Sequence, residues 1–174
     1  SFIEMPNTIP QTTNINELKK KFKIASEDSA ANFSFLFGAT NENINEILKL
    51  DKHQVAGIKI FLGSSTGNML VDDPKVLKKI FSSTDLLIAV HCEDEKTIEY
   101  NLKKNIQKYG ENIPMSSHPL IRSEKACYTS SSKAISLAKE TGARLHVFHL
   151  STGKETHLFD NKLELKDKKI TCEV

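Results

Sequence analysis

The chain has 174 residues, of which 39% are hydrophobic and 26% charged, values typical of a globular protein with a sizeable buried core. Its 24 basic and 22 acidic residues nearly cancel, so a net charge of +2 indicates no nucleic-acid or membrane partner. No apolar run approaches the ~20 residues that span a bilayer, and no leader-like segment precedes the first predicted strand. Cys92, Cys127 and Cys172 form no CxxC pair, which favours reduced thiols in a cytoplasmic protein.

Short apolar runs alternate along the chain with longer amphipathic segments, the pattern of repeated strand–helix units. Strands are predicted at Phe2–Met5, Phe33–Gly38, Gly57–Phe61, Leu86–His91, Leu145–Leu150 and Ile170–Val174. Helices are predicted at Ile15–Phe22 and Asn43–Leu50, with Asn14 and Asn41 as their N-caps, and from Asp73-Pro74 to Ile80. Further helices are predicted at Glu93–Tyr109, at Glu124–Thr141, which ends on Gly142, and at Thr152–Leu165, whose apolar periodicity is weak. Because the chain starts and stops within predicted strands, we expect it to be a fragment of a longer protein.

Two architectures fit buried strands that alternate with helices in this way. Strands of Ile, Leu, Val and Phe with little polar alternation are typical of a parallel sheet, which is buried on both faces. A doubly wound open sheet and a (β/α)8 barrel that lacks some units both satisfy the pattern. A dinucleotide-binding sheet is not expected, since the glycine-rich run at 63–67 matches neither GxxxxGK[ST] nor GxGxxG. We expect residues 1–174 to form a single domain.

Polar residues stand near the carboxyl ends of several predicted strands, where parallel α/β folds place their active sites. Asn7 follows the first strand, Lys59 lies in the third, His91 ends the fourth, and His149 lies near the end of the fifth. Each has an ordinary structural explanation when taken alone: a turn residue, a snorkelling or ion-paired lysine, and two core histidines. Their joint placement favours a metal site at which three strands converge.

Side-chain alternation predicts which of these residues face the interior of the sheet. Lys59 and His91 each share a face with small neighbours, which suits a crowded barrel interior. On the fifth strand, alternation places His149 on the same face as Val147. It places His146 on the opposite face, where we expect it to pack behind the barrel wall. The remaining histidines fall in predicted helices or loops and are expected at the surface: His53, His118 and His157.

At these residues the sequence resembles the dihydroorotase, allantoinase and hydantoinase group of amidohydrolases. The segment GIKIF at 57–61 resembles the strand with the group's carboxylated lysine, and VHCE at 90–93 and VFHLS at 147–151 resemble its later histidine strands. The segment HPLIRSE at 118–124 resembles the stretch that leads into the following helix. The segment MPNT at 5–8, followed by a proline, resembles dihydroorotase in particular. This resemblance covers nearly the whole chain and implies an incomplete TIM-type (β/α)8 barrel, approximately strands 2 to 7 of 8.

The resemblance also implies a chemistry for these residues. The group uses two divalent metal ions, normally zinc, bridged by a hydroxide and by a lysine carbamate, which here would form on Lys59. His91 and His149 would ligate the second metal ion as neutral imidazoles, and Asn7 would hydrogen-bond the substrate carboxylate. A buried lysine loses its charge readily, and the neutral amine is the form that can be carboxylated. The implied reaction is the reversible conversion of dihydroorotate to N-carbamoyl-aspartate in pyrimidine biosynthesis.

Parts of the group's site have no counterpart in this chain. The HxHxR motif of its first strand and the proton-shuttling Asp of its eighth strand are expected outside it, so we expect the chain alone to be inactive. Two alternatives stay open: an allantoinase- or dihydropyrimidinase-like hydrolase, and a non-catalytic dihydroorotase-like scaffold barrel. The presence of Lys59, His91 and His149 together argues against the scaffold. Members of the group are often dimers, so a homodimer is a further expectation, although the sequence identifies no interface.

Overall fold

The computed structural model describes residues 1–63 and 67–174, which fold around one parallel sheet. Its strands lie side by side in chain order, and every neighbouring pair is parallel. They are β1 (Phe2–Glu4), β2 (Phe33–Gly38), β3 (Gly57–Phe61), β4 (Ile88–His91), β5 (Leu145–Val147) and β6 (Ile170–Cys172). All six strands were predicted within a few residues, because each is a short apolar run bounded by polar or turn residues. Residues 64–66 of the glycine-rich run lie outside the described part of the chain.

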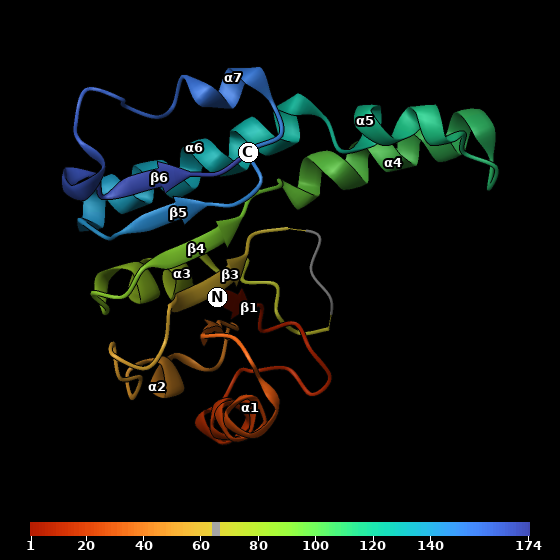
Figure 1. The fold of residues 1–174 in the computed structure, drawn as a ribbon. Helices are drawn as coiled ribbons and strands as arrows, with labels where there is room; N and C mark the ends of the chain where they lie inside the picture. The colour runs from red at the N-terminus through yellow and green to blue at the C-terminus, as the bar shows by residue number, and fades with distance from the viewer. Residues whose placement is uncertain (64–66) are drawn as a thin grey trace.

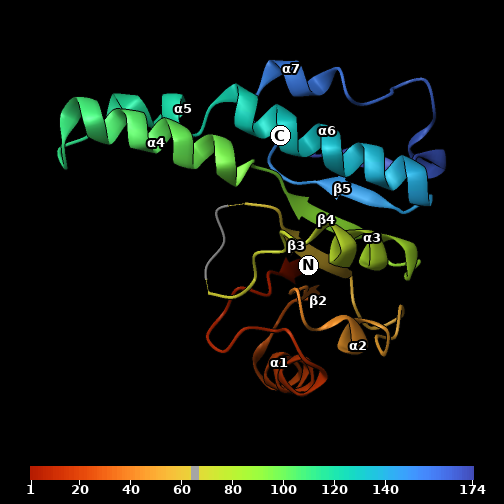
Figure 2. The same cartoon turned by 180° about the vertical axis from the view of Figure 1, so that it is seen from behind.

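Helices connect the successive strands, as the alternating pattern predicts. They are α1 (Ile15–Asp28), α2 (Ile44–Ile47), α3 (Pro74–Ser82), α4 (Glu95–Tyr109), α5 (His118–Ile121), α6 (Glu124–Thr141) and α7 (Gly153–Thr156), with 3-10 turns at Met115–Ser117 and Leu165–Asp167. Figures 1 and 2 show α4 and α5 side by side and projecting away from the sheet, while α6 and α7 stay close to β5 and β6. In the described part of the chain, no helix combines the length and the apolar character that crossing a membrane needs.

Side-chain caps determine where several helices begin and end. Asn14 caps α1 as predicted, because its Oδ1 accepts a hydrogen bond from the Glu17 N–H at 2.9 Å. The left-handed Gly142, with φ 74°, ends α6 at the predicted position. The predicted N-cap at Asn41 is wrong, since α2 starts after Asn43 and the Asn41 amide instead donates to Asp72 at 2.9 Å.

The predicted helix Thr152–Leu165 is also wrong, apart from its first turn. Only Gly153–Thr156 is α-helical, and Leu165–Asp167 forms a 3-10 turn. The Asp160 carboxylate accepts a hydrogen bond from the Lys162 N–H at 2.8 Å, a local side-chain contact that competes with helical backbone bonding. The weak apolar periodicity of this segment gives too little packing to overcome that competition.

The two faces of the sheet have different surroundings. On one face, buried side chains of the central strands pack against helices in the main core, among them Ile58, Ile60, Ile88, Val90, Leu145 and Val147. Lys59 and its neighbours point to the other face. The parallel register aligns Lys59 with Ala89, Ala89 with His146 and His146 with Thr171, so these four residues form one row across that face. Helices therefore cover one face, and the row that contains Lys59 lies on the side that would face a barrel interior.

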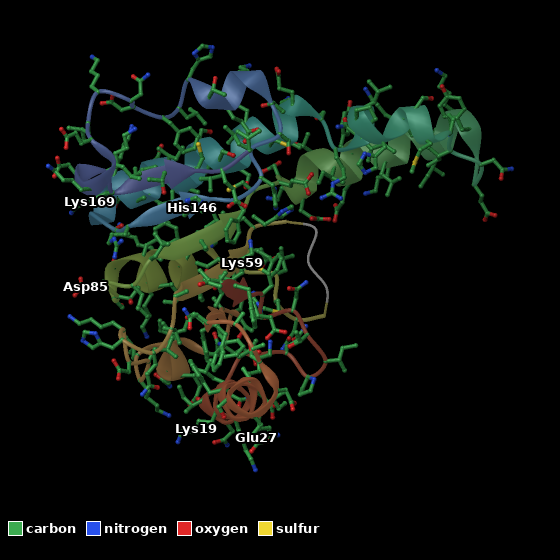
Figure 3. The ribbon with its side chains drawn as sticks, viewed as in Figure 1. Lys19, Glu27, Lys59, Asp85, His146 and Lys169 are labelled. Carbon is green, nitrogen blue, oxygen red and sulfur yellow. The ribbon has the colours of Figure 1, made fainter. Side chains whose placement is uncertain are left out.

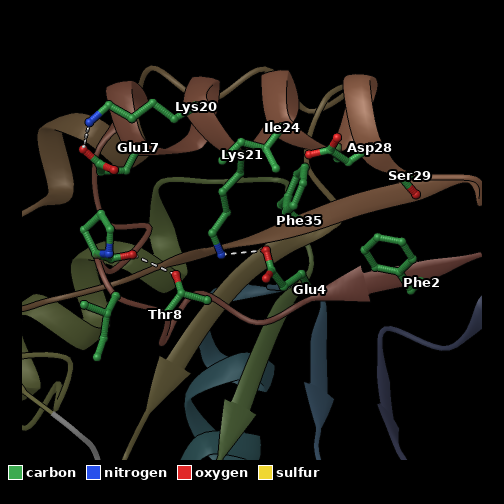
Figure 4. Close-up of a pocket in the computed structure, with 13 residues that line it drawn as sticks. Phe2, Glu4, Thr8, Glu17, Lys20, Lys21, Ile24, Asp28, Ser29 and Phe35 are labelled. Carbon is green, nitrogen blue, oxygen red and sulfur yellow. Dashed lines mark hydrogen bonds and ion pairs between the residues drawn. The ribbon is translucent and has the colours of Figure 1, made fainter.

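Both edges of the sheet are open, since β1 pairs with β2 alone and β6 pairs with β5 alone. A cavity of about 550 Å³ lies beside β1 and α1 (Figure 4). The Lys21 ammonium and the Glu4 carboxylate form an ion pair at 2.7 Å in this cavity. Phe2 and Ile24 at the cavity's edge remain 45% and 58% exposed, so this side of the sheet presents apolar surface to solvent. Within the described residues the sheet does not close into a barrel.

The close approach of β3 to β4 depends on Gly57. A Cβ atom at Gly57 would overlap the backbone carbonyl of Leu87, which cannot move without disturbing the β3–β4 ladder. We expect Gly57→Ala to lower the free energy of unfolding by ~1–3 kcal/mol, as overpacked cores do. Urea unfolding of the purified protein measures this. Gly153→Ala is the matched control, because no atom lies within 4 Å of its Cβ position. Equal unfolding midpoints for the two variants would contradict the argument.

Candidate metal centre

Lys59 lies in the middle of β3, between β2 and β4, and its side chain is fully buried. Its Nζ atom has no hydrogen-bond partner among the described residues. Instead it lies 4.5 Å from the ring centroid of Phe61 and 4.7 Å from that of Phe148. Figure 3 shows Lys59 inside the molecule, whereas Lys19 and Glu27 project from the outer surface of α1. A buried ammonium without a hydrogen-bond acceptor is costly, so the position favours an uncharged amine.

Burial has a direct effect on the protonation of Lys59. Desolvation lowers the pKa of Lys59 from its usual 10.5 to about 7, although the nearby Cys92 and Glu173 act in the opposite direction. A large fraction of the amine is therefore neutral and nucleophilic near neutral pH. A neutral amine can form a carbamate with carbon dioxide, whereas an ammonium ion cannot. The carbamate would also give this otherwise unpartnered position two oxygen ligands.

His91 and His149 bring two ring nitrogens together at the carboxyl end of the sheet. The Nδ1 atom of His91 and the Nε2 atom of His149 are 2.9 Å apart, and the ring centroids are 4.7 Å apart. Two nitrogens that each lie ~2.0–2.1 Å from one zinc ion are at most about 4 Å apart, so this pair fits a shared metal ion. Desolvation lowers the pKa of His149, and the nearby His91 and Lys59 side chains act in the same direction, against a backbone hydrogen bond and Glu173. The neutral imidazole, which is the form that binds metals, is therefore favoured.

His149 reaches this position by a route that side-chain alternation did not predict. Strand β5 ends at Val147, and Val147 faces the helix-covered core. His149 has a φ of 36°, in the left-handed region, so the chain turns after the strand and redirects the side chain. A hydrogen bond from the Phe148 N–H to the Val90 carbonyl, at 3.0 Å, anchors the start of this turn on β4. The backbone turn, and not strand parity, therefore places His149 beside His91.

The prediction for His146 is also wrong. His146 does not pack behind the barrel wall but points to the same face as Lys59, because both belong to one row of the register. Its Nδ1 atom lies 2.8 Å from the Thr171 hydroxyl on β6, and its Nε2 atom lies 3.4 Å from the Glu173 carboxylate. His146 therefore links β5 to β6 within the face that carries the candidate site.

The structure places Asn7 at the same end of the sheet but apart from the other three residues. It is exposed in the loop after β1, which is closed by a hydrogen bond from the Thr12 N–H to the Pro6 carbonyl at 2.9 Å. No hydrogen bond in the described part of the chain joins Asn7 to Lys59, His91 or His149. The structure thus brings His91 and His149 into contact, places Lys59 on the adjacent strand β3, and leaves Asn7 open to solvent.

Sequence reasoning assigned no function to Glu93 or Arg122, which contact the site. The second ring nitrogen of His91, Nε2, lies 2.9 Å from the Glu93 carboxylate, which in turn pairs with the Arg122 guanidinium. A cavity of about 620 Å³ opens beside these groups, and His149 and His118 also line it. Glu93 lies two positions after a candidate ligand, and this spacing is the sequence feature that could have indicated its contact with the site. Nothing in the sequence pattern pointed to Arg122 as its partner.

The residues present fit part of a metal centre rather than a complete one. Among residues 1–63 and 67–174, no group of three or more His, Cys, Asp or Glu side chains is arranged to hold a metal ion. His91 and His149 supply two converging nitrogens, and Lys59 supplies a third ligand position only when it is carboxylated. A complete site on this sheet therefore needs further ligands.

Comparison with known proteins agrees with this geometry. No family model matches the chain. Dihydroorotases from Methanosphaera stadtmanae and Methanosarcina acetivorans are 29% and 30% identical to it, over 94% and 99% of the chain and 37% and 38% of their own lengths. An L-hydantoinase from Paenarthrobacter aurescens and an allantoinase from Enterococcus faecalis are each 28% identical, over 99% of the chain. The solved L-hydantoinase (dihydropyrimidinase) from Arthrobacter aurescens superposes with a TM-score of 0.86 at 26% identity, over 98% of this chain and 38% of that one.

These similarities confirm two of the expectations drawn from the sequence. The resemblance to dihydroorotases and to their hydantoinase and allantoinase relatives holds over nearly the whole chain, and these relatives are enzymes. The parallel sheet with alternating helices is an incomplete TIM-type barrel, since hydantoinases with that barrel share the arrangement. The chain spans 38% of the length of that solved hydantoinase, so the greater part of such a protein lies outside these residues.

The lowered pKa of Lys59 makes the stability of the metal-free protein depend on pH. Below pH ~7 the folded protein must bury a charged amine, whereas above ~10.5 both the folded and the unfolded states hold it neutral. Between these values the unfolded chain binds the extra proton, so the free energy of unfolding rises with pH. We expect Lys59→Met to stabilise the metal-free, bicarbonate-free protein by a few kcal/mol at pH ~7, at most ~5, with a smaller gain at pH ~9.5. Urea unfolding at both pH values measures the difference, and a gain independent of pH would contradict it.

Proposed function

We propose that this chain forms the central part of a metal-dependent cyclic-amide hydrolase that interconverts dihydroorotate and N-carbamoyl-aspartate. The observation that carries the proposal is the convergence of the His91 Nδ1 and His149 Nε2 atoms at the end of the sheet that also holds the buried Lys59 amine. Lys59 lies on β3, His91 ends β4 and His149 follows β5, so the three side chains come from successive strand–helix units. A site that binds divalent metal ions explains all three.

The substrate assignment rests on a narrower set of observations than the reaction class. Dihydroorotases are among the relatives at 29% and 30% identity, while the hydantoinase and the allantoinase are each 28% identical. The segment 5–8 (MPNT) resembles dihydroorotase in particular and places the Asn7 amide at the carboxyl end of β1, open to solvent. An exposed amide at that place is free to hydrogen-bond a substrate carboxylate. This favours dihydroorotate over uncharged cyclic amides.

In the proposed mechanism, carboxylated Lys59, His91 and His149 would help to hold divalent metal ions, most simply zinc, together with ligands from outside this chain. Such ions supply hydroxide near neutral pH and polarise the amide carbonyl when they are bound. The neutral Lys59 amine forms a C–N bond to carbon dioxide and loses one proton to solvent, which leaves a carbamate anion. Phe61 and Phe148 cover the amine and keep bulk water away from it.

Substrate orientation and proton transfer would involve different parts of the protein. The Asn7 amide would donate to the substrate carboxylate and so orient the ring amide toward the end of the sheet. The proton transfer that completes ring opening would need a group outside this chain, as would the remaining metal ligands. The same proposal includes a cytoplasmic location and a homodimer, and free thiols at Cys92, Cys127 and Cys172 agree with a reducing compartment.

Turnover by the full-length protein that contains this chain tests the proposal. We expect hydrolysis of dihydroorotate to exceed that of allantoin and dihydrouracil, and to fall by more than ~100-fold in His91→Ala and Lys59→Met. Asn7→Ala is expected to raise KM for dihydroorotate more than it lowers kcat, because it removes a binding contact. His53→Gln, at an exposed histidine in the loop between α2 and β3, is the matched control. Preferred turnover of allantoin or dihydrouracil would indicate the alternative hydrolase, and metal binding without any turnover would indicate a scaffold.

The isolated 174-residue chain gives a separate test of how much of the site it contains. Because two histidines and one lysine cannot complete two metal sites, we expect no turnover and at most one weak zinc site. Zinc titration monitored by calorimetry, together with a dihydroorotate assay, measures both quantities. Two tight zinc sites with measurable turnover in this piece would show that its own residues are sufficient.

A further inference from the structure

We propose that Glu93, held in place by Arg122, is the positioning residue that directs the Nδ1 atom of His91 toward the metal ion, an inference that rests on the proposed function. The two nitrogens of the His91 ring face different partners. Nδ1 lies 2.9 Å from His149 Nε2, and Nε2 lies 2.9 Å from the Glu93 Oε2 atom. A neutral imidazole has one N–H and one lone pair, so the partner of one nitrogen determines the function of the other.

The Glu93 carboxylate selects one tautomer of His91. An ionised carboxylate only accepts hydrogen bonds, so the Nε2 atom of His91 must carry the proton and donate it. The lone pair then lies on Nδ1, the nitrogen that faces His149. The carboxylate also fixes the plane of the imidazole ring. A histidine without such a partner would divide its population between two tautomers and several ring orientations.

Arg122 orients the Glu93 carboxylate through two contacts. Its Nε atom donates to Glu93 Oε1 at 2.7 Å, and its Nη2 atom donates to Glu93 Oε2, which gives a two-pronged pair. The Glu93 side chain is only 7% exposed, so an ionised carboxylate there needs a cation beside it. The same contact raises the pKa of Arg122. Glu93 Oε2 thus lies between the guanidinium of Arg122 and the imidazole of His91.

The backbone on both sides of this pair is constrained by other elements. A Cβ atom at Gly63 would overlap the carbonyl of Glu93, so the segment after β3 packs directly against the Glu93 backbone. The N–H of the next residue, Asp94, donates to the Ala126 carbonyl of α6 at 3.1 Å. On the Arg122 side, the Asn101 amide of α4 donates to the carbonyl of Ile121 at 3.1 Å. The orientation of His91 is therefore connected to α4 and α6 through Glu93 and Arg122.

A purely structural ion pair between the end of β4 and the segment after α5 would make a different prediction. Such a pair would affect the free energy of unfolding but not the affinity for metal once the protein is folded. A positioning residue changes metal affinity in a folded protein, because the other tautomer of His91 must be displaced before Nδ1 can bind. Metal affinity and the absorption spectrum of bound cobalt therefore distinguish the two explanations.

The test uses Glu93→Gln in the full-length protein, with zinc affinity measured by competition against a chromophoric chelator. Glutamine has the same size as glutamate but no charge, so it no longer selects one tautomer or pairs with Arg122. We expect zinc to bind ~10–100-fold more weakly and the visible absorption bands of bound cobalt to change. Asp94→Asn is the matched control, since this neighbouring carboxylate caps α4 through Thr97 and forms an ion pair with Lys133. The control is expected to bind zinc as the unmodified protein does.

Arg122→Gln is the second variant, and it keeps the test decisive where Glu93→Gln fails to fold. Arg122 contacts Glu93, which in turn contacts His91, so we expect a smaller loss of zinc affinity, ~3–10-fold, in the same direction. Urea unfolding of the metal-free variants shows that the proteins compared are folded. Unchanged zinc affinity and cobalt spectra in the folded variants would overturn the proposal.

His91→Ala separates this proposal from the proposed function. Unchanged zinc affinity in His91→Ala would refute the metal site itself, and the positioning proposal with it. A large loss in His91→Ala, combined with unchanged affinity in Glu93→Gln and Arg122→Gln, would refute only the positioning by Glu93. Losses in all three variants, with Asp94→Asn unaffected, are the expected result.

Discussion

The burial of the Lys59 amine is the constraint on which the rest of this site depends. A lysine in the middle of a parallel sheet loses its hydration, and within residues 1–63 and 67–174 its Nζ atom gains only the faces of Phe61 and Phe148 in exchange. The protein accepts this cost at the centre of its sheet, where an apolar side chain would stabilise the fold more. The lowered pKa of Lys59 is the chemical consequence. A fold that keeps a neutral amine at this place has a nucleophile there, which under the proposed function would react with carbon dioxide.

The parallel register brings polar residues from neighbouring strands to one end of the sheet that holds this buried amine. Because β3, β4 and β5 run in the same direction, their carboxyl ends meet at one end of the sheet, and residues that end different strands become neighbours. His91 is the last residue of β4, so the strand itself places it at this end of the sheet. His149 needs the left-handed turn after β5, where a φ of 36° in a residue other than glycine reports a conformation that the surroundings impose. The pair of histidines at 2.9 Å is therefore a product of strand order and of one unusual backbone angle.

The open edges of the sheet and the incomplete site have a common explanation. The solved L-hydantoinase matches 98% of this chain, yet the chain covers 38% of that protein, so much of such a barrel protein has no counterpart in these residues. Apolar side chains such as Phe2 and Ile24 beside β1 are left in contact with solvent. Under the proposed function, residues outside this chain would supply the remaining metal ligands as well as the remaining barrel strands.

The sequence alone determined the strands, the parallel class and the shared face of Lys59 and His91, because short buried runs and two-residue alternation are local properties. Local patterns failed where a distant contact decides the structure. The Asn41 amide binds Asp72 and does not cap a helix, and the segment after Thr156 lacks the packing to stay helical. Side-chain alternation could not predict where the His149 side chain points, since a positive φ at that residue breaks the two-residue period of a strand. The contact of Glu93 with Arg122 joins residues 29 positions apart, so only the tertiary structure could show it.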